Sequence, residues 1–143
     1  MTMKKLIVLV AVLAGGCGIR KQVIYSDNAP APVGPYSQGI LSGNILFVSG
    51  QIGMNSAGEL DSTSIENECR QSLENIRSIV EAAGMRMKHV AKTTIYLTDL
   101  RNYTLVNAVY QSYFQTDQPA RETVEVKKLP KGAHIEISVI ARK

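Results

Sequence analysis

The sequence lacks the short motifs that identify the common cofactor-dependent and metal-dependent enzymes. It contains no P-loop and no GxGxxG, HExxH, GxSxG or CxxC pattern. Only two of the 143 residues are cysteine and two are histidine, and neither cysteine has a histidine or a second cysteine at the spacing of a metal site. We therefore expect a protein that uses neither a metal nor a cofactor.

Strong charge is also missing. The formal net charge is +4, and it falls to about +2 if the two N-terminal lysines are removed with a signal segment. No run of lysine and arginine and no row of aromatic residues stands out, so the sequence does not favour nucleic acid as a partner. The hydrophobic content of 45% is typical of one globular domain with its own core.

The N-terminus has the pattern of an export signal. Basic Met1–Lys5 precedes apolar Leu6–Ala14, a run too short to cross a bilayer of about 30 Å as a permanent helix. The end of the run, Gly15-Gly16-Cys17, resembles the bacterial lipoprotein signal, in which the cysteine becomes the lipidated N-terminus. We expect a signal peptide over 1–16, a tether over 17–21 and a domain over 22–143, held in the cell envelope by the lipid alone. A plain secretory signal, and a misassigned start that leaves the protein in the cytoplasm, remain open.

The hydrophobic period predicts six strands and two helices. We expect strands over 22–25, 33–40, 45–49, 89–97, 121–126 and 134–142, and helices over 65–83 and from about 98 to 114. The order β-β-β-α-β-α-β-β favours an α+β sandwich of two layers, in which both helices cover one face of a mixed six-stranded sheet. The other face mixes polar and apolar residues, which favours a symmetric oligomer.

Both helices carry residues with a predicted role. Thr63 and Glu66 form a capping box at the start of the first helix, and Gly84 ends it. Cys69 lies on the apolar stripe of this helix and is expected to be a packed hydrophobe rather than a nucleophile. The inward face of the second helix is expected to carry Tyr103, Val106, Asn107, Tyr110 and Phe114. Asn107 is either a clasp to backbone groups, which we favour, or part of a site.

One arginine is the strongest candidate for chemistry. Arg121 follows Pro119-Ala120, where the proline restricts the backbone, and it begins a run of β-branched residues. Its planar guanidinium group can therefore be held in position against a carboxylate. The alternative is a surface arginine at a strand end. If the last two strands pair as a hairpin, Arg121 and Glu136 share the sheet face opposite the helices. Glu136 could then orient water against a C=N bond, with Tyr36 as a wall or donor. His134, beside a turn, is expected to be solvated.

Several ordered segments resemble one known family. They are Asn28-Ala29-Pro30, Gly34-Pro35-Tyr36-Ser37-Gln38-Gly39, Val48-Ser49-Gly50-Gln51-Ile52, Lys92-Thr93-Thr94-Ile95-Tyr96-Leu97-Thr98-Asp99-Leu100, Pro119-Ala120-Arg121 and Leu129-Pro130-Lys131-Gly132. Together they span the domain, and they resemble the Rid family of reactive intermediate deaminases. The resemblance implies a chorismate-mutase-like fold, a homotrimer with sites in the clefts between subunits, and hydrolysis of 2-imino acids or enamines to 2-keto acids and ammonia without a cofactor.

The resemblance also implies roles for individual residues. Arg121 matches the arginine that binds the substrate carboxylate, and Glu136 matches the glutamate that positions water. Tyr36 and Gly50 match residues that line the cleft, and Asn107 matches an asparagine near the site.

Two features depart from the family pattern. Glu122 and Thr123 stand where many members have serine and cysteine, so Thr123 is expected to replace the cysteine among the substrate-binding residues. An envelope location would separate the protein from the cytosolic pyridoxal-phosphate enzymes that release imines. A non-catalytic module that binds small carboxylates therefore remains the alternative function.

Overall fold

The computed structural model describes residues 20–143. The predicted signal peptide over 1–16 and the lipidation site Cys17 lie outside this range. Within it, no helix combines the length and the apolar character needed to cross a membrane.

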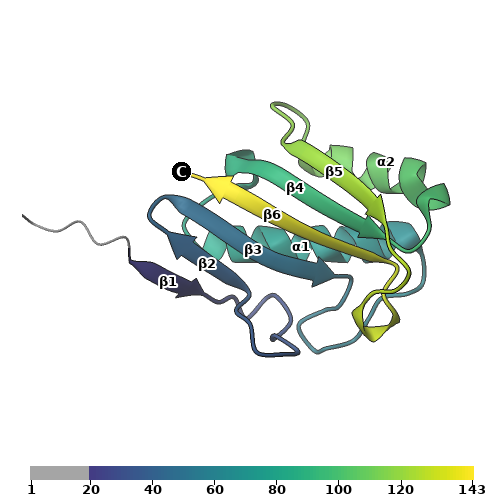
Figure 1. The fold of residues 1–143 in the computed structure, drawn as a ribbon, viewed down its shortest axis with the longest axis horizontal. Coiled ribbons are helices and arrows are strands. Elements are labelled where there is room, and N and C mark those ends of the chain that lie inside the picture. Colours follow the sequence, from purple (N-terminus) through teal and green to yellow (C-terminus); the bar gives the residue numbers. More distant parts are fainter. Residues whose placement is uncertain (1–19) are drawn as a thin grey trace, which may run out of the picture.

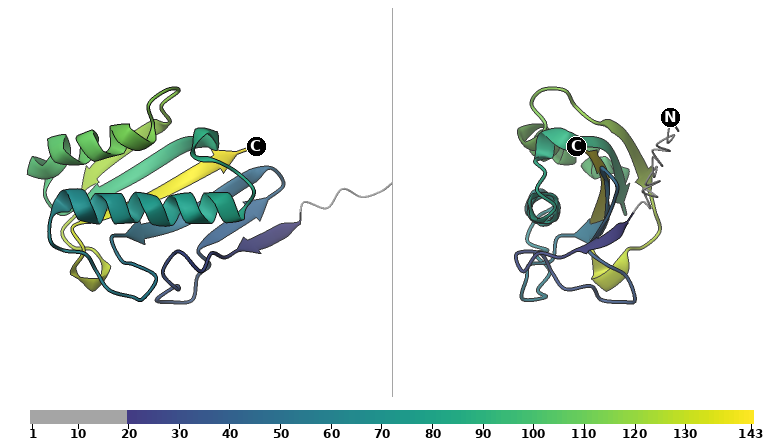
Figure 2. Two further views of the ribbon diagram at one scale, coloured as in Figure 1. Left: turned by 180° about the vertical axis from the view of Figure 1, so that it is seen from behind. Right: turned by 90° about the vertical axis from the view of Figure 1, so that its left-hand side faces the viewer.

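The domain is a six-stranded mixed sheet with two long helices on one face (Figure 1). The strands are β1 (Lys21–Ile24), β2 (Gly39–Ser42), β3 (Ile45–Ile52), β4 (Val90–Leu97), β5 (Ala120–Glu125) and β6 (Ile135–Arg142), and the helices are α1 (Ile65–Ala82) and α2 (Tyr103–Tyr113). The order across the sheet is β1-β2-β3-β6-β4-β5, with β4 and β5 as the parallel pair. The end-on view in Figure 2 shows both helices on the same side of the curved sheet. The predicted α+β class, its two layers and its element order are confirmed.

The core lies between the sheet and the two helices. The predicted stripe of α1 is buried, with Cys69, Leu73 and Ile76 fully inaccessible. Burial raises the pKa of the Cys69 thiol to about 12, so the prediction of a packed, unreactive cysteine is confirmed. Each large aliphatic side chain buried in this way contributes about 1.5–3 kcal/mol.

The ends of α1 differ slightly from the prediction. Ser64, not Thr63, is the N-cap, and its hydroxyl accepts a hydrogen bond from the backbone N–H of Asn67 at 3.1 Å. Thr63 instead donates to Asp61. Gly84 has a φ of +69° after the last turn, as expected of a helix-ending glycine.

Two further predictions are corrected. The strand expected over 33–40 begins only at Gly39, because the side chain of Gln38 turns inward and bonds to the backbone of the preceding loop. On α2, Tyr103 is 40% exposed rather than inward, and Val109 occupies the buried face in its place.

The last two strands do not pair as a hairpin, which was the condition for Arg121 and Glu136 to share a face. β4 lies between β5 and β6, since the crossover from β4 through α2 places β5 parallel to β4 at the sheet edge. Arg121 is level with Thr93, which is buried beneath α2, so Arg121 is on the helix-covered face. Glu136 alternates with buried Ile135 and Ile137 and is on the opposite face. Arg121 and Glu136 therefore do not share a face of the sheet.

The face without helices, here called the bare face, carries an apolar row. Val23, Ile40, Phe47 and Ile140 pair in register across four neighbouring strands. Val23 is 62% exposed and Phe47 is 46% exposed. Large exposed apolar groups in one contiguous row are typical of an interaction surface.

Candidate active site

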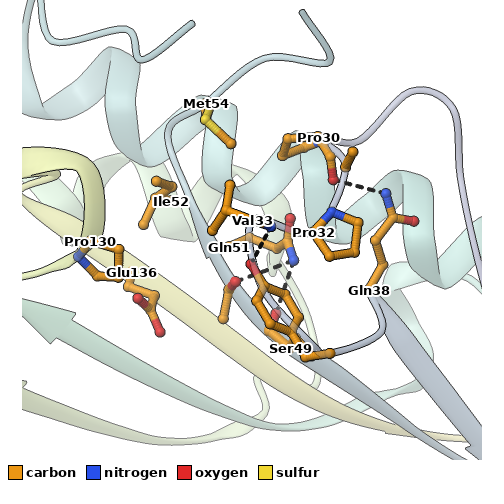
Figure 3. A pocket seen from close by; sticks show the side chains of 13 residues that line it. Pro30, Pro32, Val33, Gln38, Ser49, Gln51, Ile52, Met54, Pro130 and Glu136 are labelled. Carbon is orange, nitrogen blue, oxygen red and sulfur yellow. Dashed lines mark hydrogen bonds between the residues drawn. The ribbon is translucent and has the colours of Figure 1, made fainter. Parts of the chain in front are cut away.

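Three of the predicted site residues meet in one cavity at the end of β3. Tyr36, Gly50 and Glu136 line a space of about 240 Å³, together with apolar residues from the loop before β2. Figure 3 shows Glu136 beside Pro130 on one side of this cavity and Pro32 with Val33 on the other. We call this space the Glu136 cavity.

Gly50 and Glu136 are in direct contact in the Glu136 cavity. A Cβ atom added at Gly50 would lie 2.0 Å from Oε1 of Glu136 and 2.6 Å from its Cδ, so any side chain at this position would displace the carboxylate. β3 is irregular here, with a register shift between Val48 and Gln51 where it pairs with β6. Partial burial raises the pKa of Glu136 above its ordinary value. The result is a carboxylate held against backbone and partly withdrawn from water.

The loop wall of the Glu136 cavity is fixed by one buried amide. Gln38 is 2% exposed. Its Oε1 accepts from the backbone N–H of Ser26 at 2.7 Å, and its Nε2 donates to the carbonyls of Ala29 and Pro30. Gln38 has no role that its sequence context predicts. A strand-like alternation does not distinguish a side chain that points to solvent from one that bonds to a loop eight or more residues earlier.

The other predicted residues meet at a second cavity, between α2 and β5. Asn107, Tyr110 and Arg121 line this space of about 480 Å³, which we call the Arg121 cavity. The Arg121 guanidinium carbon lies 4.8 Å from the ring centre of Tyr110 and 5.6 Å from that of Tyr103. Nη2 of Arg121 also donates to the Tyr103 hydroxyl at 3.0 Å. Stacking on two aromatic rings orients the planar fork while leaving donors free for an anion.

Two buried polar atoms near Arg121 have no hydrogen-bond partner among residues 20–143. They are Oδ1 of Asn107 and Oγ1 of Thr123. The favoured prediction that Asn107 clasps backbone groups is therefore wrong, and its other expected role, as part of a site, fits its place in the Arg121 cavity. Buried polar atoms are rarely left unpaired in folded proteins, so these two stand out among the described residues.

A buried carboxylate that the sequence did not reveal supports the start of β6. Glu68 of α1 is fully buried. Its Oε1 accepts from the backbone N–H groups of His134 and Ile135 at 2.6 and 3.2 Å, and its Oε2 lies 3.0 Å from Nδ1 of His134. His134 is thus a half-exposed partner of Glu68 rather than merely solvated, and the pair fixes the backbone next to Glu136.

The two cavities are chemically complementary and incomplete alone. The Glu136 cavity offers a carboxylate and an apolar wall but contains no cationic group. The Arg121 cavity offers the cation but no carboxylate. No group of three or more His, Cys, Asp or Glu side chains with the geometry of a metal site occurs within residues 20–143.

The sheet order, the helix placement and these two cavities define a chorismate-mutase-like α+β domain. A family model described as endoribonuclease L-PSP matches residues 26–143. A RutC family protein of Pyrococcus horikoshii is 48% identical over 124 residues, which are 86% of this chain and 98% of the relative. The human 2-iminobutanoate/2-iminopropanoate deaminase is 42% identical over 85% of this chain and 89% of its own length.

A solved structure agrees with both sequence matches. The crystal structure of Escherichia coli TdcF with bound serine has a TM-score of 0.82 and 37% identity, covering 85% of this chain and 98% of that one. The chain belongs to the Rid family, also described as the RutC or L-PSP family.

Proposed function

We propose that this protein hydrolyses reactive 2-imino acids and their enamine tautomers to 2-keto acids and ammonia, without a cofactor. The observation that carries the proposal is the Glu136 carboxylate, held over Gly50 with a raised pKa at the edge of an apolar cavity. Relatives at 42% and 44% identity are named 2-iminobutanoate/2-iminopropanoate deaminase. The serine found in TdcF carries the same kind of α-carboxylate that Arg121 would bind here.

The chemistry needs only the groups described above. Arg121 binds the substrate carboxylate through two parallel hydrogen bonds. Glu136 accepts a proton from water as the water oxygen bonds to the imine carbon, and it passes this proton to the imine nitrogen. In the resulting carbinolamine the hydroxyl proton is transferred through Glu136 to the amino nitrogen, the C–N bond breaks, and the products are ammonia and the keto group. A carboxylate whose pKa is raised towards the working pH is a better base for the first step.

We further propose that the site is completed by a second copy of the chain, in a homotrimer. Glu136 and Arg121 are on opposite faces of one sheet, so one subunit cannot present both to a small substrate. The apolar row on the bare face supplies a surface for association. In such an assembly the Glu136 cavity of one subunit meets the Arg121 cavity of its neighbour.

The activity is tested by ammonia release from 2-iminobutanoate, generated in situ by an amino acid oxidase. The wild-type chain should accelerate imine decay, whereas Arg121→Ala and Glu136→Gln should each reduce kcat/KM by about 10²-fold or more. A wild-type rate no faster than that of Arg121→Ala would refute the enzymatic function.

The shared site is tested by mixing the two inactive variants. Each mixed assembly contains sites that combine intact Arg121 from one subunit with intact Glu136 from another. Unfolding and refolding the mixture should restore about one quarter of the wild-type activity, the fraction expected for random assembly. No recovery, in a mixture whose assembly is confirmed by light scattering, would contradict a site built by two subunits.

A non-catalytic module that binds small carboxylates is the second candidate. Thr123 in place of the cysteine common in the family favours it, since the hydroxyl of Thr123 is buried without a partner. In that case calorimetry would detect a 2-keto acid bound through Arg121, while imine decay would not accelerate.

We also propose a lipid anchor at Cys17 and a location in the cell envelope, on the pattern of the N-terminal sequence. Cys17→Ser should release the protein from membranes that are washed with high salt, which removes purely electrostatic contacts. Persistent association of this variant after the wash, with its signal peptide cleaved, would exclude Cys17 as the anchor.

A further inference from the structure

Residues that are scattered along the sequence form one basic end of the molecule. The turn between β2 and β3, the start of β1 and the end of β6 lie side by side, because Lys21 pairs with Ser42 and Ile45 pairs with Arg142. The start of β4 joins them, since Val90 pairs with Ala141. Figure 1 shows the start of β1 and the C-terminus at the same end of the sheet. The exposed basic residues of this end are Arg20, Lys21, Arg86, Lys88, Arg142 and Lys143.

These side chains are not neutralised within the described part of the chain. None of them forms an ion pair with another residue of 20–143, whose ion pairs lie elsewhere. The acidic residues at this end are Glu81, in the last turn of α1, Asp117, in the loop before β5, and Glu122, which is paired with Lys92 near the start of β4. Basic groups therefore outnumber acidic ones, and their charge faces solvent.

We infer that this basic end docks on a membrane surface rich in anionic lipid. The occupant is indicated by charge and by connectivity, since Arg20 and Lys21 of this end follow the proposed lipidation site Cys17 by only 3 and 4 residues in the sequence. A tether that short would hold this end of the domain against the bilayer surface. Basic side chains near an anionic leaflet are each worth about fivefold in partitioning. The contact is additional to the proposed lipid anchor and does not require imine hydrolysis.

In this orientation the Glu136 cavity is open to the aqueous phase. The Glu136 cavity is formed by the last residues of β3 and the first residues of β6, at the opposite end of those strands from Ile45 and Arg142. Docking through the basic end therefore points this cavity away from the bilayer. A small charged substrate would reach it from the aqueous phase.

The test uses residues 20–143, without the tether. Nearly the whole length of the P. horikoshii relative corresponds to this part of the chain, so it is a complete folding unit. Binding to vesicles of phosphatidylcholine alone is compared, by flotation, with binding to vesicles containing about one third phosphatidylglycerol. We expect binding to the anionic vesicles only, weakened several-fold between about 50 and 300 mM salt.

Two triple variants that reverse the same amount of charge distinguish an effect of the basic end from an effect of the overall net charge. Lys21→Glu with Lys88→Glu and Lys143→Glu alters the basic end. The matched control, Lys127→Glu with Lys128→Glu and Lys131→Glu, alters the loop between β5 and β6 at the opposite end. The first triple variant should lose at least about 100-fold in partitioning, and the control should lose less than about threefold.

Three outcomes would overturn the inference: equal loss in both triple variants, equal binding to neutral and anionic vesicles, and displacement from the vesicles by a short RNA at lower concentration than by free lipid headgroup. Thermal unfolding of both triple variants establishes that each is folded before binding is compared. An inactive but vesicle-bound wild-type domain would refute the proposed hydrolase and leave the docking surface standing.

Discussion

Replacing Gly50 with alanine should separate activity from stability. The new Cβ would lie 2.0 Å from Oε1 of Glu136, and real Cβ atoms essentially never approach other atoms within 3.0 Å. The carboxylate oxygen must therefore move by about 1 Å or more, and a displacement of that size in a catalytic group costs about 10²-fold in rate, or about 2.7 kcal/mol in the barrier.

The fold should tolerate the same change. Gly50 does not have a positive φ, and the obstructing atoms belong to the end of a flexible, half-buried side chain. Replacing a strand glycine with alanine stabilises by about 0.5–1 kcal/mol, which offsets a rotamer cost of similar size at Glu136. We expect the free energy of unfolding in urea to change by less than about 1 kcal/mol.

Gly58 provides the matched control with the opposite pattern. Its φ is +85° and a Cβ would meet nothing within 4 Å. Gly58→Ala should thus cost about 1–2 kcal/mol of stability through backbone strain alone, while imine hydrolysis stays at the wild-type rate.

A double variant tests whether Gly50→Ala lowers activity by displacing the Glu136 carboxylate. If Gly50→Ala acts by displacing Glu136, then adding it to Glu136→Gln should reduce kcat/KM by little more than Glu136→Gln alone. A further 10²-fold loss in the double variant, or a Gly50→Ala rate within about threefold of wild type, would refute the reasoning.

Three other substitutions test separate parts of the structure. Glu68→Ala should lower the free energy of unfolding by about 3 kcal/mol, because it leaves two buried N–H groups unpaired; in urea titrations Glu68→Gln, which keeps an acceptor oxygen, should cost about half as much. Arg121→Lys keeps the charge but loses the fork and the stacking on Tyr110, so KM should rise by at least about tenfold with a smaller change in kcat; equal KM values would contradict bidentate binding. The raised pKa of Glu136 should place the acid limb of kcat/KM above the ordinary range of a glutamate, and the limb should vanish in the residual rate of Glu136→Gln. Since the folded pKa of Glu136 exceeds the unfolded one, wild type should lose stability relative to Glu136→Gln as the pH rises above the ordinary pKa of a glutamate.

The sequence predicts the elements of this fold well where one local rule decides them. The spacing of apolar residues locates α1. Gly84 marks its end because the backbone there has a positive φ, which glycine adopts most easily. The cap was misassigned by one residue because Thr63 and Ser64 are equally suited to it. Asp61 binds the Thr63 hydroxyl and so removes it as a cap, which is a tertiary detail that spacing does not encode.

Long-range partners account for the residues that sequence reasoning misjudged. Gln38 follows a strand-like alternation, but its amide binds a loop that begins 12 residues earlier. Glu68 interrupts the apolar face of α1, and its partners lie 66 and 67 residues further along the chain. A buried polar group must be paired, yet nothing in its neighbourhood in the sequence tells which distant backbone will pair with it.

The arrangement of the site depends on the order of the strands in the sheet. That order is set by contacts between segments far apart in the sequence. Tyr36, Gly50 and Glu136 line one cavity and Arg121 lines another, because alternation within each strand fixes faces only relative to a partner strand. With β4 inserted between β5 and β6, the arginine turns towards α2 and the glutamate towards the bare face. A hairpin would have produced one site in one subunit. The observed order produces two incomplete cavities, so association becomes a condition of the proposed chemistry rather than an addition to it.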